Sequence, residues 1–359
     1  MIINATNIGQ RLSGIERYSL SLSLYFLEHW DYPFQLFINK SALAHFEKVK
    51  NNRKIKVVDE SISPDFGFRG HLLRLLWSNK LGLQNQKELI FNASQLEGCL
   101  LHKKQIITVH DLIPLIFRQY HRKQFFYFKF MLPVILRNSV RIVTGSHHTK
   151  HLMMKFYKIH EKKIRVIPYG IDDFFLNRTP QHKKKSYILY VGRLSETKNI
   201  AGLLEAFEIL LDEYALELKL KLTGYEWKLN FGIDERIRDK IEFVGYPDED
   251  QLIELYRNAL VLVLPSFYEG FGFPPLEAMA CGCPVVVSNV ASLPEVCGDA
   301  AYYIDPHNIE SIAEGIYRVL TDESLRQSLI NKGLERVKLF SWKKSAKEHI
   351  KIFEEVLSS

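Results

Sequence analysis

The chain has 359 residues, a length that fits two domains of ordinary size better than a single hydrophobic core. Its content of 47% hydrophobic and 25% charged residues is that of a globular protein, and no apolar run approaches the ~20 residues that span a bilayer. The formal net charge of +7 indicates an anionic ligand, and nucleic acid, phosphorylated small molecules and an acidic membrane surface all remain open.

The first half of the chain alternates short apolar runs with helical patterns. Strands are predicted at residues 1–5, 34–38, 89–93, 105–111, 141–146 and 164–170. Helices are predicted after Gly14, near 72–79 and from about 122 to 137. The following run, 171–186, is polar and contains Pro180, and we interpret it as a linker between two domains.

The second half shows the same alternation more clearly. Strands are predicted at residues 187–192, 218–224, 241–245, 260–266, 284–288 and 301–305. Helices are predicted at 199–214 and 248–259, the latter with Asp248 as N-cap and Gln251 at the spacing of a capping box. The run 341–357 is predicted to form one amphipathic helix.

Apolar strands that alternate with helices indicate parallel, doubly wound sheets. We therefore expect an α/β fold of two Rossmann-like domains, residues 1–172 and 173–340, facing a central cleft. Residues 341–359 are expected to form a C-terminal helix that crosses back to the first domain. Ligands of such sheets bind beyond the carboxyl ends of the strands, so the loops that follow the strands hold the candidate site residues.

The segment PSFYEGFGFPPLEAMACGCPVVVS, residues 265–288, places two acids eight residues apart, Glu269 and Glu277. Pro274 and Pro275 predict the start of a short helix, because proline suits the first helical turn and not the interior. Glu269 is therefore expected on a loop and Glu277 in the first turn of that helix. A solvated loop acid and a helix-capping acid explain the two residues about equally well.

Two loops offer groups that suit a phosphate. Gly270 and Gly272 allow backbone amides to approach a ligand closely, beside a helix N-terminus. The segment VGRLSETKN, residues 191–199, places Arg193 and Lys198 after a predicted strand. A bidentate guanidinium and a compact ammonium together could neutralise a diphosphate without a metal. A solvated pair of loop cations is the alternative interpretation.

These motifs in combination resemble glycosyltransferase family 4. The resemblance rests on GRLSETKN, on EGFGFPPLE followed by AMACGCPVVVS, on VIPYGID before the linker, and on Phe340 and Trp342 near the closing helix. It extends from the Gly14 turn through most of the chain. It implies the GT-B fold and a metal-independent hexosyltransferase of the bacterial surface-polysaccharide type, acting on a nucleotide-diphosphate sugar with retention of configuration.

The resemblance also implies roles for single residues. Glu269 corresponds to the acid that contacts hydroxyls of the donor sugar, and Glu277 to the acid that binds the ribose diol. Arg193 and Lys198 correspond to the pair that binds the diphosphate and stabilises its charge as it leaves. The remaining donor-binding positions in the second half are Gly245 and Tyr246 near the base, and Gly270, Phe271, Gly272 and Leu276 around the sugar.

Two further positions come from the first half. Gly14 corresponds to the loop glycine whose helix N-terminus approaches the diphosphate, and His110 to a histidine that lines the sugar pocket after a strand. A buried histidine paired with Asp111 is the alternative interpretation of His110. The segment SHHTK, residues 146–150, fits either an acceptor-side contact or a helix capped by Ser146.

No metal and no other cofactor is expected. The sequence has no Asp-x-Asp after a strand in a position suited to a divalent metal, and residues 248–250 fit helix capping better. The HDLIPL form of the histidine motif is similar to that of mannosyltransferases and favours GDP-mannose as donor. A sugar-nucleotide epimerase of the same fold and a non-catalytic protein that binds an anionic ligand are the alternatives.

The expected partners are the nucleotide-sugar donor and a saccharide or lipid-linked saccharide acceptor. The basic and aromatic region 118–165 also suggests peripheral contact with an anionic membrane, although a core-facing helix with a solvated basic face explains the same pattern. No nucleic-acid-binding signature is present. Four cysteines do not make a disulfide framework, and the start MIINATNIG lacks the features of an export signal. We therefore expect a cytoplasmic protein, at the inner face of the membrane.

Overall fold

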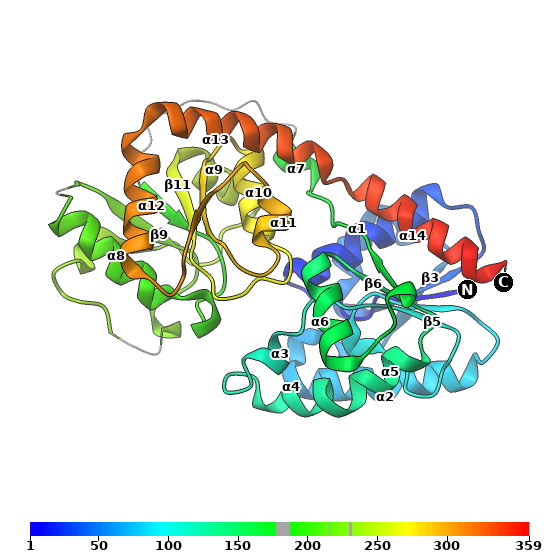
Figure 1. Cartoon of the computed structure of the whole chain (residues 1–359). Helices are drawn as coiled ribbons and strands as arrows, with labels where there is room; N and C mark the ends of the chain where they lie inside the picture. Colours follow the sequence, from blue (N-terminus) through cyan, green and yellow to red (C-terminus); the bar gives the residue numbers. More distant parts are fainter. Residues whose placement is uncertain (177–186, 215, 230–231, 359) are drawn as a thin grey trace. The chain divides into compact units, whose positions relative to one another are not determined.

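The computed structural model describes residues 1–176, 187–214, 216–229 and 232–358. Most of the predicted linker, residues 177–186, lies outside the described residues. The chain divides into two compact units. The first unit consists of residues 1–170 and 341–359, and the second of residues 171–340 (Figure 1).

The described residues of the first unit form a seven-stranded sheet in the order β3-β2-β1-β4-β5-β6-β7, and each neighbouring pair is parallel. The strands are β1 Ile2–Asn4, β2 Gln35–Asn39, β3 Ile55–Val58, β4 Ile90–Asn92, β5 Gln105–Thr108, β6 Arg141–Thr144 and β7 Ile164–Val166. The prediction of parallel strands is confirmed, and β3 is an additional edge strand.

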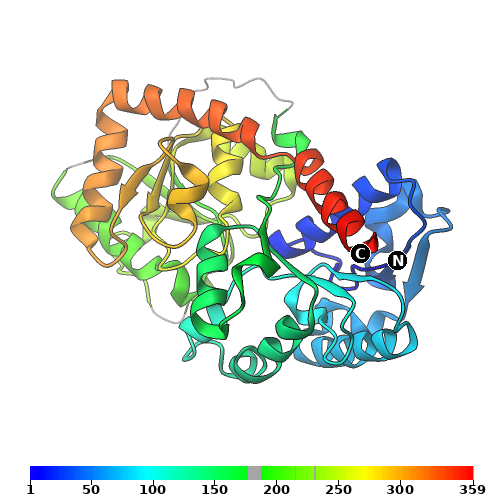
Figure 2. The same cartoon turned by 45° about the vertical axis from the view of Figure 1, so that its right-hand side comes forward.

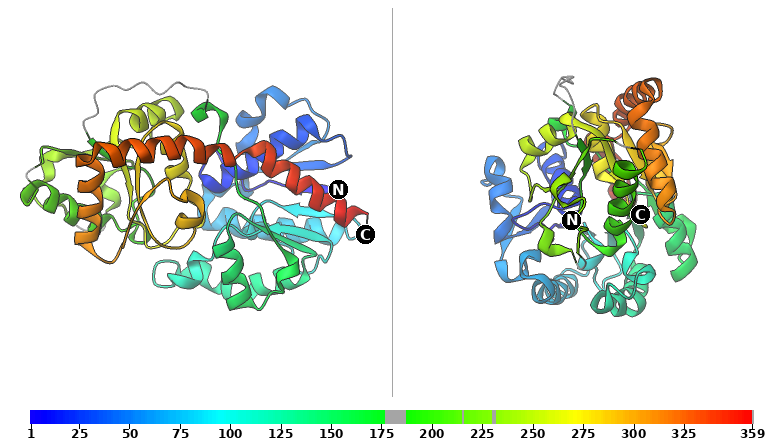
Figure 3. Two further views of the ribbon diagram at one scale, coloured as in Figure 1. Left: turned by 45° about the horizontal axis from the view of Figure 1, so that its top comes forward. Right: turned by 90° about the vertical axis from the view of Figure 1, so that its left-hand side faces the viewer.

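Helices cover both faces of this sheet (Figure 3). They are α1 Gly14–His29, α2 Gly67–Gln84, α3 Ile113–Ile116, α4 Arg122–Phe126, α5 Leu132–Asn138, α6 His147–Tyr157 and α14 Trp342–Leu357. Short 3₁₀ segments lie at Lys40–Val49, Glu60–Ile62, Pro64–Phe66, Gln95–Glu97 and Glu161–Lys163. Helix α6 is capped by Ser146, whose hydroxyl accepts a hydrogen bond from the Thr149 amide at 3.2 Å.

The helix predicted from 122 to 137 is confirmed, and it contains one irregular turn. A π-helical turn, Tyr127–Met131, separates α4 from α5. Pro133 stands in the first turn of α5, where it has no N–H to donate to the carbonyl of Lys129 and its ring crowds that carbonyl. A wider turn relieves this conflict, and the helical run continues without a break to Asn138.

Helix α14 packs beside α1, although more than 300 residues separate them in sequence (Figure 3). The rings of Phe26 and Phe353 meet at 5.5 Å between centroids. The Tyr18 hydroxyl lies 2.8 Å from Nε2 of His349, and both residues are fully buried. The amphipathic helix predicted at 341–357 is thus part of the core of the first unit.

The described part of the second unit contains a six-stranded sheet in the order β10-β9-β8-β11-β12-β13, with parallel neighbours. Its strands are β8 Tyr187–Tyr190, β9 Lys219–Leu222, β10 Ile241–Phe243, β11 Ala259–Leu264, β12 Val285–Ser288 and β13 Tyr302–Ile304. These strands confirm the sequence prediction, because β8, β11 and β12 are almost wholly buried and carry continuous apolar runs.

The helices of this unit are α7 Asp173–Leu176, α8 Ile200–Asp212, α9 Glu249–Asn258, α10 Phe273–Ala280, α11 Leu293–Cys297, α12 Ile309–Thr321 and α13 Glu323–Arg336. Short 3₁₀ segments lie at Glu196–Lys198, Glu226–Lys228, Arg238–Lys240 and Val337–Leu339. Asp248 caps α9 and exchanges the two hydrogen bonds of a capping box with Gln251, as predicted. No helix in the described ranges is both long and apolar enough to cross a membrane.

Candidate active site

The second unit presents its candidate residues at the carboxyl ends of two adjacent strands, β8 and β11. The order of the sheet reverses between them, because the chain leaves β8 toward β9 on one side and later adds β12 and β13 on the other. Ligands of doubly wound sheets bind at such a reversal. The loop after β8 carries Arg193 and Lys198, and the loop after β11 carries Glu269.

The two loops are joined by an ion pair. Nζ of Lys198 lies 2.6 Å from Oε1 of Glu269, and the two side chains are 19% and 11% exposed. The Ser266 hydroxyl donates to the same Oε1 at 2.8 Å. A backbone hydrogen bond from Phe267 N to Thr197 O, 3.0 Å long, holds the loops together beside the pair. A largely buried charge pair with several fixed partners is thus placed at the sheet reversal.

Asn199 fixes the backbone that carries Lys198. It has a left-handed conformation with φ of 55°, and its Oδ1 accepts a hydrogen bond from the amide of Gly202, which caps α8. Its Nδ2 donates to the Pro306 carbonyl at 2.8 Å. Sequence reasoning did not identify this residue, although Asn tolerates such a backbone conformation better than most residues.

Glu277 stands on α10 with only 6% of its surface exposed. The hydroxyl of the fully buried Tyr256, on α9, donates to Oε2 of Glu277 at 2.7 Å. Helix α10 begins at Phe273, one residue before the predicted prolines, so Glu277 lies in its second turn and not in the first turn as predicted. Gly272 precedes it with φ of 109°, a conformation that L side chains rarely adopt, and an added Cβ would lie 2.9 Å from Cδ2 of Leu293.

Ser292 ties down the loop that carries Glu269. Its hydroxyl is fully buried and lies 2.9 Å from the carbonyl oxygen of Glu269 and 2.8 Å from that of Phe271. Gly270 lies between these two carbonyls, so the Ser292 hydroxyl fixes the turn whose amides were predicted to hold the sugar. A lone serine before a short helix gives no sequence signal for this role, and sequence reasoning missed it.

The remaining predicted donor positions in this unit differ in exposure. Gly245 and Gly224 exchange backbone hydrogen bonds of 3.1 and 2.6 Å, which join the ends of β9 and β10. Tyr246 is exposed, and its ring meets that of Tyr225 edge to face. The side chain of Leu276 is fully buried on α10.

His110 follows β5 in the first unit and is 4% exposed. Its Nε2 lies 3.0 Å from the Ala93 carbonyl, and its Nδ1 lies 2.7 Å from the Tyr169 hydroxyl. A carbonyl can only accept, so Nε2 carries the proton and Nδ1 accepts from Tyr169. Burial lowers the pKa of His110 to about 4, which keeps the ring neutral. Asp111, the partner of His110 in the alternative interpretation, accepts a hydrogen bond from the Ile113 amide at its Oδ1.

Gly14 begins α1, as expected. The carboxylate of Glu16, in the first turn, accepts a hydrogen bond of 2.8 Å from the Ser13 amide. An acid therefore already lies at the helix N-terminus that was predicted to approach a diphosphate, where it is favoured by the same dipole.

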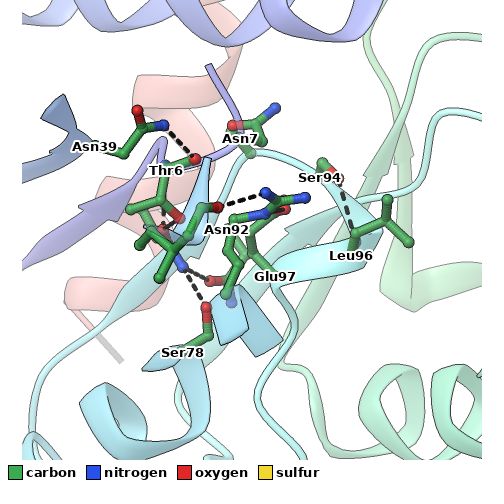
Figure 4. A network of polar contacts seen from close by, with 12 residues as sticks. Thr6, Asn7, Asn39, Ser78, Asn92, Ser94, Leu96 and Glu97 are labelled. Atoms are coloured by element: carbon green, nitrogen blue, oxygen red, sulfur yellow. Dashed lines mark hydrogen bonds and ion pairs between the residues drawn. The ribbon is translucent and has the colours of Figure 1, made fainter. Parts of the chain in front are cut away.

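A buried polar network lies where β1, β2 and β4 end in the first unit (Figure 4). Asn4 donates to Ser78 and Asn92, both at 3.0 Å. Arg74 and Glu97 form an ion pair of 2.7 Å with almost no exposure, and the burial raises the pKa of Glu97. These hydrogen bonds hold the loops at the carboxyl ends of the three strands in place. Sequence reasoning did not predict this network.

Within the described ranges, no group of three or more His, Cys, Asp or Glu side chains is arranged to hold a metal ion. On the loop after β8, Arg193 is exposed, whereas Lys198 is partly buried in its ion pair with Glu269.

Comparison with known proteins gives matches over nearly the whole chain. The family described as Glycosyltransferase Family 4 matches residues 12–173, and the family described as Glycosyl transferases group 1 matches residues 172–336. The O-antigen chain mannosyltransferase B of Escherichia coli is 31% identical over 98% of this chain and 99% of its own length. The O-antigen chain mannosyltransferase RfbU of Salmonella typhimurium is 28% identical over 89% of this chain and 90% of its own length.

Solved structures show the same fold at low identity. WaaG, a glycosyltransferase involved in lipopolysaccharide biosynthesis, superimposes with a TM-score of 0.75 at 13% identity, over 98% of this chain and 99% of its own. HepE of Anabaena, solved with UDP and glucose, gives a TM-score of 0.75 at 14% identity, over 99% of this chain and 100% of its own.

Proposed function

Because the chain belongs to glycosyltransferase family 4 and has the two-domain GT-B fold of a hexosyltransferase, we propose that it transfers mannose from GDP-mannose to a saccharide or lipid-linked saccharide. The reaction would serve the synthesis of an O-antigen or a related surface polysaccharide. The observation that carries this proposal is the 31% identity, over 98% of the chain, to an O-antigen mannosyltransferase. The epimerase and non-catalytic alternatives have no such support.

The site supports a division of roles. Arg193 and Lys198 would bind the diphosphate and stabilise its charge when the bond between it and the sugar carbon breaks. Glu269, on the loop after the other strand of the reversal, would accept hydrogen bonds from hydroxyls of the mannose, and Glu277 from the ribose diol. In this scheme the Lys198–Glu269 ion pair is a resting arrangement that holds both groups ready for the donor.

We further propose that the transfer retains the anomeric configuration and requires no metal. Two side-chain cations beside the diphosphate can supply the charge that a divalent ion would otherwise provide. The anomeric signals of the product in NMR spectra test the first statement, and an unchanged rate in EDTA tests the second. Inversion of configuration or loss of activity in EDTA contradicts the corresponding statement.

The test of donor and activity is a panel of GDP-, UDP- and ADP-sugars, with release of the nucleoside diphosphate and the mass of the product as readouts. We expect GDP-mannose to be the best donor. We expect Lys198→Ala and Glu269→Ala each to lower kcat/KM by about a hundredfold or more, the size typical of lost electrostatic stabilisation. If no sugar nucleotide turns over, or if both variants retain full activity, the proposed function is wrong.

The proposal includes a place for the reaction. We propose that the enzyme works in the cytoplasm at the inner face of the membrane, with region 118–165 close to anionic lipid. Four free, buried cysteines, all within the described residues, suit a reducing compartment. Fractionation of cells that express the chain tests the location.

A further inference from the structure

Helix α2 of the first unit has an apolar stripe on its exposed side. Phe68, Leu72, Leu76 and Leu83 are 47–60% exposed. Their spacing places all four within one narrow arc of the helix. The opposite side packs inward with the buried residues Arg74, Ser78 and Leu81. A surface helix normally carries polar residues on its outer face, so this stripe needs a partner.

The segment α4–α5 carries a second stripe. Phe126, Phe130 and Val134 follow each other at intervals of four residues and are 42–61% exposed. The rings of Phe126 and Phe130 are stacked, with centroids 6.4 Å apart. The two exposed aromatic rings thus lie next to each other in one row on the surface of this segment.

The two stripes belong to one surface. Nζ of Lys123, on α4, lies 5.4 Å from the centre of the Phe68 ring on α2. Leu75 of α2 belongs to the same buried core cluster as Leu132 and Ile135 of α5, so both segments cover the same side of the sheet. Figures 1 and 2 show the two segments side by side. We define the α2/α5 face as the apolar residues Phe68, Leu72, Leu76, Phe126, Phe130 and Val134 together with Lys123 and Lys129.

The two chain segments that carry this face contain basic residues and no acidic residue. Residues 66–87 and 112–160, the segments that carry it, contain 13 Lys or Arg and no Asp or Glu. The whole chain has 48 basic and 41 acidic residues, so the residues outside these two segments include 35 basic and 41 acidic ones. The whole positive surplus of the chain lies in these two segments. A face of this charge repels a second copy of itself, whereas it complements an anionic surface.

We propose that the α2/α5 face docks on an anionic phospholipid bilayer. Its Phe and Leu side chains would enter the boundary between headgroups and acyl chains, while Lys123, Lys129 and neighbouring basic residues contact lipid phosphates. The choice of a bilayer as partner rests in part on the proposed function, since a lipid-linked acceptor would lie in that bilayer. The face itself includes α2, which the sequence pattern of region 118–165 does not contain.

The test is cosedimentation of the full chain with phosphatidylglycerol/phosphatidylcholine vesicles and with pure phosphatidylcholine vesicles, at low and high salt. We expect binding to the anionic vesicles, weakened by salt. The double variants Leu72→Gln/Leu76→Gln and Phe126→Gln/Phe130→Gln should each lower partitioning on the order of tenfold, because two apolar side chains no longer insert. Lys123→Gln/Lys129→Gln should lower it by about fivefold per lysine.

Matched controls come from exposed positions outside the face. Leu339→Gln, 57% exposed, removes a comparable leucine from the second unit. Lys343→Gln/Lys347→Gln removes two exposed lysines from α14. Both controls should bind vesicles as the original chain does, and thermal melting shows that each variant is folded. The proposal is overturned if face variants and controls bind vesicles equally. It is also overturned if light scattering shows that the face variants break up a dimer while their vesicle binding is unchanged.

Transfer to a soluble acceptor saccharide separates this inference from the proposed function. The face variants should release nucleotide from the donor at the original rate. If the chain binds anionic vesicles through this face but uses no sugar nucleotide, the proposed function fails and the docking face stands. If it transfers mannose but does not bind anionic vesicles, the docking face and the proposed lipid contact of region 118–165 fail, and the proposed transfer reaction stands.

Discussion

Tyr256 positions Glu277 through a hydrogen bond of 2.7 Å between two buried groups. We expect Tyr256→Phe to weaken donor binding, raising the KM for GDP-mannose up to about tenfold with a smaller change in kcat, because a buried hydrogen bond contributes about 1 kcal/mol. The control is Tyr187→Phe, which loses a hydrogen bond of 2.9 Å to the carbonyl of Leu255, a residue that is not a predicted site residue. Equal KM values for both variants would contradict a positioning role.

Ser292 acts on the backbone of the site and not on a charged group. Without its hydroxyl, the carbonyls of Glu269 and Phe271 lose a shared donor and the turn between them loosens. Steady-state kinetics should show about a tenfold lower kcat/KM for Ser292→Ala. Ser288→Ala, at a buried hydroxyl 3.4 Å from the Leu264 carbonyl, serves as control and should keep its kcat/KM.

Strands buried on both faces were predicted well, because a continuous apolar run can hardly be placed elsewhere. The edge strand β3 was missed, since its sequence IKVV has two exposed residues, Lys56 and Val57, between two half-buried ones. The acids and cations of the site were found from their motifs. Their partners were not, because Lys198 and Glu269 lie 71 residues apart and Tyr256 and Glu277 21, and only the order of the strands brings them together.

The N-terminal end of α14 packs tightly against Gly170. A Cβ at Gly170 would lie 2.2 Å from the backbone N and 2.6 Å from Cα of Trp342, atoms that cannot rotate away. We expect Gly170→Ala to lower the free energy of unfolding by about 1–3 kcal/mol, as overpacking does. Urea denaturation measures it, with Gly232→Ala as control, because no atom lies within 4 Å of a Cβ there. A change of the same size in both variants would refute the packing argument.

The first unit as a whole should be sensitive to acid. Burial lowers the pKa of His71, His110 and His349 from 6.5 to about 4. Between these values the unfolded chain binds protons that the folded unit does not, so stability should fall as pH drops from about 6.5 to 4. Each fully buried histidine contributes about 3 kcal/mol across that range. Glu97, whose pKa is raised by burial, acts in the opposite direction.

Chemical denaturation at a series of pH values measures this dependence. His349→Gln should flatten the slope, whereas the exposed His151→Gln should leave it as it is. A slope that is unchanged by His349→Gln would show that the buried ring does not carry the effect.

Helix α14 belongs to the core of the first unit, yet the 170 residues of the second unit precede it in the chain. Tyr18, Phe26 and Phe91 therefore have no His349 or Phe353 to pack against until the ribosome has made the second unit. At typical synthesis rates this interval is roughly ten to thirty seconds. During translation the second unit can therefore fold before the first unit is complete. Until α14 has been synthesised, the apolar surface of the first unit that α14 will cover stays exposed to chaperones.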